Sequence, residues 1–147
     1  TLLKGLGTPT PGALTITGSG SDATGIAWSV VQAAGVDSCG AGVTAAGSGT
    51  VATLTLPGTP ATGDAAFAAV AIEGKTLSTW EAGWTELHNV VETVRVRRLT
   101  TAWDNAHDAT PQVSWAGSYG WGSVGCFLVA SGGFQAAWAA GSNRVIS

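Results

Sequence analysis

The chain has 147 residues, of which 10% are charged and 45% hydrophobic, and its formal net charge is −3. An ordinary apolar fraction with few charges is unlike a disordered chain, so we expect a folded protein. Six basic residues against nine acidic ones argue against a nucleic-acid partner, because nucleic acids are bound mainly through their phosphates. The longest apolar run, residues 65–72, is far shorter than the roughly 20 residues that span a bilayer, so we expect no membrane partner.

Residues 1–12 are predicted to form an extended N-terminal arm, because glycines and prolines interrupt them too often for regular structure. Such a segment often orders on a neighbouring molecule. Its apolar residues, Leu2, Leu3 and Leu6, are the candidates for that contact. The remaining residues, 13–147, have the length of one domain.

Short β-type runs separated by turn residues follow the arm, and no amphipathic helical pattern is present. The predicted strands are residues 13–17, 26–34, 51–56, 65–72, 80–87 after an initial turn, 90–99, 109–116, 124–130 and 134–139. Residues 37–50 have the composition of a linker, and residues 117–122 that of a turn. Residues 65–72 are apolar at every position, which is typical of a central strand. This pattern predicts an all-β fold, an antiparallel two-sheet β-sandwich.

The two cysteines, Cys39 and Cys126, are 87 positions apart and belong to no CxxC motif, so a structural zinc site is not expected. Cys126 lies within an apolar run and is predicted to be a small buried residue. Whether the two cysteines form a disulfide is left open by the sequence.

The histidines, His88 and His107, do not accompany a recognisable nucleophile motif such as GxSxG, and we expect a non-enzymatic protein with no catalytic residues. Asp104, Asn105, His107 and Asp108 could offer ligands to a calcium ion. They lack the rest of a known calcium loop, and a solvated turn held by local hydrogen bonds is favoured. We therefore predict no metal and no cofactor.

Seven tryptophans raise the question of a carbohydrate platform, since exposed indoles can stack on sugar rings. Four of them lie in or beside apolar runs and are predicted to be core or interface anchors: Trp28, Trp84, Trp115 and Trp138. Three lie next to turns and are the candidates for exposure: Trp80, Trp103 and Trp121. Tryptophan enrichment at protein interfaces explains the same composition without a sugar.

Half of the six basic residues are Arg95, Arg97 and Arg98. In one continuous strand, Arg95 and Arg97 would point to one face and Arg98 to the other, which prevents a single flat patch. One interpretation is an exposed edge strand that uses charge to prevent unwanted pairing. The functional interpretation is docking onto an acidic shell or a neighbouring subunit, where arginine suits carboxylate contacts.

Residues 50–132 carry an ordered series of motifs: VATLTLP at 51–57, TGD at 62–64 before an apolar strand, AGWTEL at 82–87, an arginine-bearing strand, a tryptophan-containing strand, and WG at 121–122 before a final apolar strand. This order resembles a family of jelly-roll-like β-sandwich domains in tailed-bacteriophage virion proteins. The resemblance implies that Pro57 closes a strand, that Gly63 and Asp64 open the central one, and that Trp84 packs under the sheet edge. Residues 1–35 depart from the pattern and resemble the closing hairpin of a preceding copy.

The resemblance implies a structural role at the surface of the virion, assembled in the host cytoplasm. The favoured hypothesis is a capsid decoration protein that binds the outer surface of a phage head. Its partners would be the major capsid protein and copies of itself, with a trimer as one arrangement. The alternative is a tail, fibre or adhesin module that binds host carbohydrate through the tryptophans expected to be exposed.

Overall fold

The computed structural model describes residues 26–33, 35–58, 61–93, 96–105, 108–130, 139–140 and 144–146. The arm predicted for residues 1–12 and the strand predicted for residues 13–17 lie outside these ranges. So does most of the strand predicted for residues 134–139.

The described residues form strands and no helix, and every strand pairing is antiparallel. The main sheet consists of β3 (Val36–Cys39), β4 (Val43–Thr53), β5 (Ala65–Ile72), β6 (Ser78–Trp80), β7 (Thr85–Glu92), β8 (Arg97–Asp104) and β9 (Gln112–Ala130). Two small ribbons pair β1 (Ile26–Trp28) with β11 (Arg144–Ile146) and β2 (Val31–Gln32) with β10 (Ala139–Ala140). The predicted all-β, antiparallel class is confirmed.

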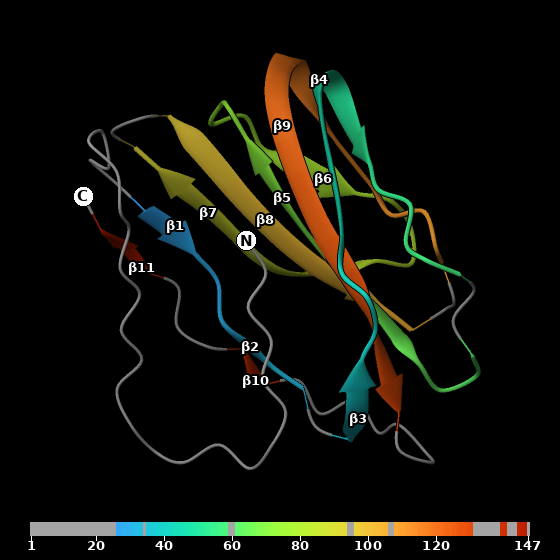
Figure 1. The fold of residues 1–147 in the computed structure, drawn as a ribbon. Helices are drawn as coiled ribbons and strands as arrows, with labels where there is room; N and C mark the ends of the chain where they lie inside the picture. Colours follow the sequence, from blue (N-terminus) through green and yellow to red (C-terminus); the bar gives the residue numbers. More distant parts are fainter. Residues whose placement is uncertain are drawn as a thin grey trace.

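The long strand β9 organises the main sheet, whose order is β3-β9-β5-β8-β7, with β4 and β6 also paired to β9 (Figure 1). β4 and β9 arch over together at one end of the sheet. Their ladder shifts register between Gly49 and Val51, and Gly117 adopts a φ of 88° at the arch. The turn predicted for residues 117–122 is therefore wrong: all six lie within β9, and residues 119–122 pair with residues 46–49 of β4.

The linker-like composition of residues 37–50 conceals most of β3 and the larger part of β4. Backbone pairing with β9 needs no large side chains, and at Gly47 a side chain would be harmful. A Cβ atom at Gly47 would lie 2.9 Å from Cζ2 of Trp121. The small residue is thus required by an indole on the neighbouring strand.

The single strand predicted for residues 90–99 is also wrong, because β7 ends at Glu92 and β8 begins at Arg97. The two strands form a hairpin in which Glu92 lies opposite Arg97. Val96 adopts a φ of 54°, a conformation that is unusual for a β-branched residue. The connection has no glycine, proline or asparagine, so the sequence carries no turn signal there.

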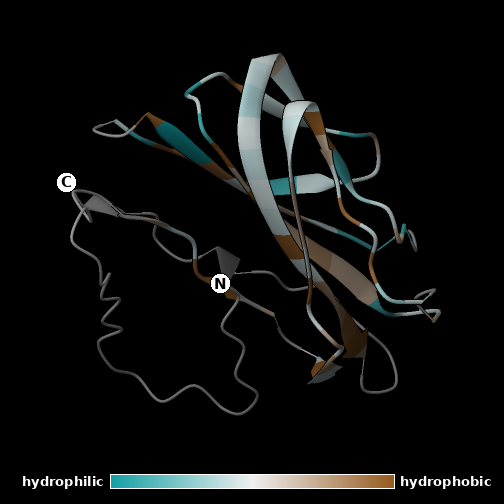
Figure 2. Cartoon of the chain, turned by 45° about the horizontal axis from the view of Figure 1, so that its top comes forward, coloured by the Kyte–Doolittle hydropathy of each residue, from teal (hydrophilic) through white to brown (hydrophobic). Residues whose placement is uncertain are grey.

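One face of the main sheet packs on the hydrophobic core, and β5 contributes Ala66, Ala68, Val70 and Ile72 to it. The residues after β4 close over this face: a Cβ atom at Gly125 would meet Leu54 and Leu56 side chains. Figure 2 shows pale, neutral residues along much of the arch of β4 and β9, whereas hydrophobic residues gather towards the opposite end of the sheet.

Asp64 joins the beginning of β5 to the end of β9. Its Oδ1 atom accepts a hydrogen bond from Ala130 N at 3.1 Å, and its Oδ2 atom accepts one from Ala61 N at 3.0 Å. β5 begins at the next residue, Ala65, as the TGD motif predicts.

Candidate functional site

The second face of the main sheet, opposite the core, carries a series of half-buried apolar side chains. Strand register places Phe67 opposite Trp103, Ala69 opposite Val124 and Ala71 opposite Leu99, so these residues point to one side. The larger members of this second face are Phe67, Leu99, Trp103, Val124 and Leu128, all half-buried. Ala69 and Ala71 of β5 lie among them on the same face.

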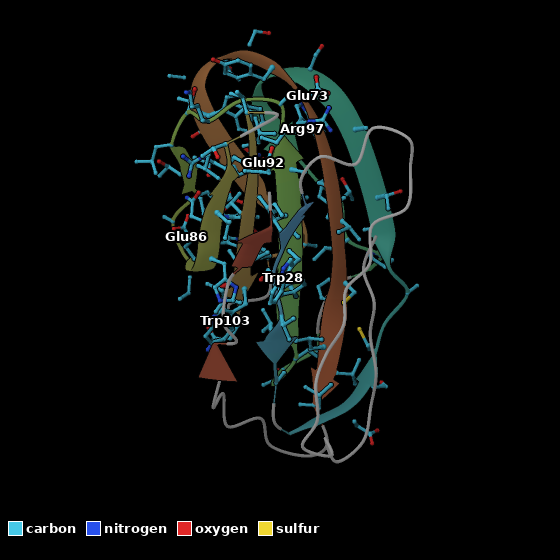
Figure 3. The ribbon with its side chains drawn as sticks, turned by 90° about the vertical axis from the view of Figure 1, so that its left-hand side faces the viewer. Trp28, Glu73, Glu86, Glu92, Arg97 and Trp103 are labelled. Carbon is cyan, nitrogen blue, oxygen red and sulfur yellow. The ribbon has the colours of Figure 1, made fainter. Side chains whose placement is uncertain are left out.

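Strand β1 lies against part of this second face, over β7 and β8. Ser29, just after β1, places its Oγ atom 2.5 Å from Nδ1 of His88 and 3.4 Å from Oγ1 of Thr101. Figure 3 shows Trp28 between Trp103, which lies below it, and Glu92, Arg97 and Glu73, which lie above it. The contact of Ser29 with His88 was not foreseen from the sequence, because the two residues are 59 positions apart.

The Ser29 and His88 pair offers no complete catalytic triad among the described residues. His88 is 6% exposed, and its Nε2 atom has no hydrogen-bond partner in that part of the chain. A triad needs an acid that orients the imidazole. The pair instead supplies a buried polar contact between the β1 segment and β7. His107 lies outside the described residues.

A carboxyl cluster occupies the turns beside β6 and β8. Asp108 Oδ2 accepts a hydrogen bond from Trp84 Nε1 at 2.9 Å, and its Oδ1 atom accepts one from Thr110 N at 2.8 Å. Asp104 Oδ2 accepts one from Asp108 N at 3.3 Å. The expected local hydrogen bonds are present, but the expected solvated turn is wrong for Asp104, which ends β8 and is 3% exposed. In the described ranges, no group of three or more His, Cys, Asp or Glu residues is arranged to hold a metal ion.

Glu81 belongs to the same cluster, and its pKa is raised by burial and by the nearby negative charges of Asp108 and Asp104. Burial alone would raise the pKa of Asp108, but hydrogen bonds from Trp84, Thr110 and Glu81 outweigh it and lower that pKa. The opposite shifts mean that, as pH falls, Glu81 takes up a proton more readily than Asp108 does.

Changing Glu81 to Gln should therefore alter the pH dependence of stability. Because the pKa of Glu81 in the folded state lies above its ordinary value of 4.5, ionisation of Glu81 disfavours the fold as pH rises through the window from 4.5 to the raised value. Glu81→Gln should be more stable than the parent above this window and should approach it below pH 4.5. Urea unfolding across this pH range measures the difference. Asp37→Asn, at an exposed position, is the control.

The structure divides the tryptophans differently from the sequence prediction. Trp84 and Trp115 are buried, as predicted. The prediction of exposure is wrong for Trp80, which is 8% exposed and stacks on Trp84 with ring centroids 5.5 Å apart. Trp28, predicted to be an anchor, is half-buried, and Trp138 lies outside the described residues.

The other two tryptophans expected to be exposed are half-buried. Trp121 packs against the core and beside Gly47, so its ring is committed to an internal contact. Trp103 lies on the second face of the sheet, opposite Phe67. Of the three platform candidates, Trp103 retains the position best suited to meeting another molecule.

A polar network explains the burial of Trp80. Its Nε1 atom donates to Oγ1 of Thr100 at 2.7 Å, and the Thr100 hydroxyl donates to Oε2 of Glu86 at 3.4 Å. Asn89 Nδ2 donates to the same Glu86 oxygen at 2.8 Å. These bonds connect β6 to β7 and β8 across the core.

Thr100→Val should lower the free energy of unfolding by about 1–3 kcal/mol, because it keeps the shape of the side chain but leaves the buried Trp80 N–H without its acceptor. Thr79→Val, at an exposed position of β6, should change stability by less than about 0.5 kcal/mol. Equilibrium denaturation compares them. Equal stability of the two variants would contradict the assigned role of the Thr100 hydroxyl.

The arginines do not form one docking patch in the described residues. Arg97 is exposed and pairs with Glu73 at 3.6 Å, and Figure 3 shows both near Glu92 at one end of the sheet. Arg98 is 8% exposed, so its proposed docking role is wrong: its guanidinium donates to Asn89 Oδ1 and to Lys75 O. Burial lowers the pKa of Arg98, and the charge of Glu86 counteracts this effect. Arg95 lies outside the described residues.

The interpretation of this segment as an edge strand is also wrong, because β8 lies between β5 and β7. Arg98 lies on the core side of that strand, where the Asn89 side chain and a backbone carbonyl accept hydrogen bonds from its guanidinium. Sequence alternation alone could not reveal this, since it does not show which strand covers which.

The chain has no significant match among protein-family models, curated proteins or solved structures. The described part of the chain contains no helix long and apolar enough to cross a membrane.

Proposed function

We propose that this chain is a non-enzymatic structural protein of a tailed-bacteriophage virion, a decoration protein that packs on the outer surface of the capsid. Its partners are the major capsid protein and further copies of itself, in a trimeric arrangement. In this proposal the curled antiparallel sheet belongs to a jelly-roll-like β-sandwich. The location is the particle surface, after assembly in the host cytoplasm.

The observation that supports this proposal best is the second face of the main sheet. Its half-buried apolar side chains include Phe67, Val124 and Leu128, and the two strands that carry these three residues, β5 and β9, contain no charged residue. A face built of apolar side chains and few charges favours packing against another protein, because little charge must be desolvated. The capsid is the occupant to which we commit, on the strength of the ordered motifs at residues 51–57, 62–64 and 82–87.

Binding to capsids tests the proposal directly. The full chain should co-sediment saturably with capsids assembled from the major capsid protein of the same genome. Leu128→Ser, on the second face, should weaken binding, whereas Leu77→Ser, at a residue 69% exposed elsewhere, should not. Circular dichroism establishes that both variants are folded. Absence of co-sedimentation at every concentration, or equal binding by both variants, would contradict the proposal.

A deletion variant tests the role of the N-terminal arm in the same binding assay. Removal of residues 1–12, which include Leu2, Leu3 and Leu6, should reduce capsid occupancy. Unchanged occupancy would show that the arm does not contribute to anchoring.

Carbohydrate binding by a tail, fibre or adhesin module is the second candidate function, and the half-buried Trp103 is the observation that favours it. If it is correct, the chain should bind specific sugars on a glycan array, and Trp103→Ala should abolish the signal. Trp121→Phe, which keeps an aromatic ring against Gly47, is the matched control. An array without binding by the parent chain would exclude this candidate.

A further inference from the structure

The two cysteines of the chain meet in the main sheet although 87 positions separate them. The Sγ atoms of Cys39, on β3, and Cys126, on β9, lie 3.0 Å apart. The sequence has no other cysteine, so no competing pairing is available within one chain.

The strand register explains why the two sulfur atoms meet. Cys39 lies opposite Leu128 in the antiparallel pair of β3 and β9, and Cys126 is two residues before Leu128. Residues two apart in a strand point to the same face, so both cysteine side chains are on the second face of the sheet. Gly40 N donates a hydrogen bond to Phe127 O at 2.8 Å, which holds the two backbones together at this position.

We propose that Cys39 and Cys126 are joined by a disulfide that links β3 to the long strand β9. This proposal is independent of the proposed function. The two side chains differ in access, because Cys126 is 1% exposed and Cys39 is half-buried. Cys39 is therefore the entry point for an oxidant, and Cys126 is the resolving residue.

The oxidant is a small-molecule disulfide such as oxidised glutathione. The Cys39 thiolate attacks one glutathione sulfur, which forms a mixed disulfide and releases one reduced glutathione. The Cys126 thiolate then attacks the Cys39 sulfur, which forms the protein disulfide and releases the second reduced glutathione. Two protein thiols are oxidised by two electrons, and one glutathione disulfide is reduced to two thiols.

The cross-link closes a loop that contains all of β4 to β8. A disulfide that closes a long loop restricts the unfolded chain strongly. It would also hold β3, at one end of the sheet order, against β9. The oxidised chain should therefore unfold at a higher urea concentration than the reduced chain.

The test uses the full folded chain, reduced and then incubated with oxidised glutathione. Alkylation after denaturation should modify two thiols per chain before oxidation and none afterwards, and the denatured product should have the mass of a single chain with no bound glutathione. Two thiols that remain after oxidation, two glutathiones per chain, or a disulfide-linked dimer would each overturn the proposal.

Single variants test the assigned order of reaction. Cys126→Ser should retain one glutathione on Cys39, because the resolving thiol is absent. Cys39→Ser should take up no glutathione while folded, because Cys126 is buried. Equal glutathione uptake by the two folded variants would overturn the assignment of Cys39 as the entry point. Mass spectrometry measures the glutathione uptake, and circular dichroism establishes that both variants are folded.

Discussion

Trp80→Ala should lower the free energy of unfolding by about 3–5 kcal/mol, the usual cost of removing a large aromatic side chain from a core. Trp80 is 8% exposed, stacks on Trp84 and donates to Thr100. Alanine would leave a cavity beside Trp84 and remove a hydrogen bond that connects two strands. Urea denaturation monitored by circular dichroism measures the loss.

The matched control is Leu77→Ala, three residues earlier in the chain. Leu77 is 69% exposed, and its replacement should change stability by less than about 0.5 kcal/mol. If Trp80→Ala were as stable as this control, Trp80 would have to be a surface residue. The result therefore also tests whether Trp80 can serve as a carbohydrate platform.

Gly125→Ala should destabilise the fold by about 1–3 kcal/mol through overpacking. A Cβ atom at this position would lie 2.7 Å from Leu54 Cδ2 and 2.7 Å from the backbone oxygen of Phe67. The leucine can move, but the carbonyl belongs to the neighbouring strand β5 and cannot yield without disturbing the ladder. The same denaturation experiment measures this cost.

Gly122 provides the control, because it lies on the same strand and a Cβ atom there would meet nothing within 4 Å. Gly122→Ala should match the parent within about 0.5 kcal/mol. A larger loss for Gly122→Ala than for Gly125→Ala would contradict the packing described for the core side of β9.

Part of the candidate site follows from local pattern. The apolar run at residues 65–72 predicts β5 with the bounds that the structure has, because the TGD motif before it is a strong turn signal. The alternation of that strand also puts Phe67 and Ala66 on opposite faces. The pattern does not show how deeply each face of β5 is buried, since that depends on β9, β8 and the segment after β4.

The contacts between reactive side chains could not be predicted from local sequence patterns. Ser29 meets His88, and Cys39 meets Cys126, across 59 and 87 positions of sequence. No spacing rule connects such residues, because their proximity depends on which strands pair and in which register. The carboxyl pair of Glu81 and Asp108 likewise needs the turn before β7 to meet the turn before β9.

The sequence by itself determined the all-β class, the central strand β5, and the burial of Cys126, Trp84 and Trp115. Each of these depends on local composition or on the two-residue period of a pleated strand. Only the tertiary structure decided that Trp80 and Arg98 are buried and that residues 117–122 continue β9. The reason is physical: a side chain beside a turn is exposed or covered according to a distant strand, and a glycine-rich segment becomes a strand when a partner satisfies its backbone hydrogen bonds.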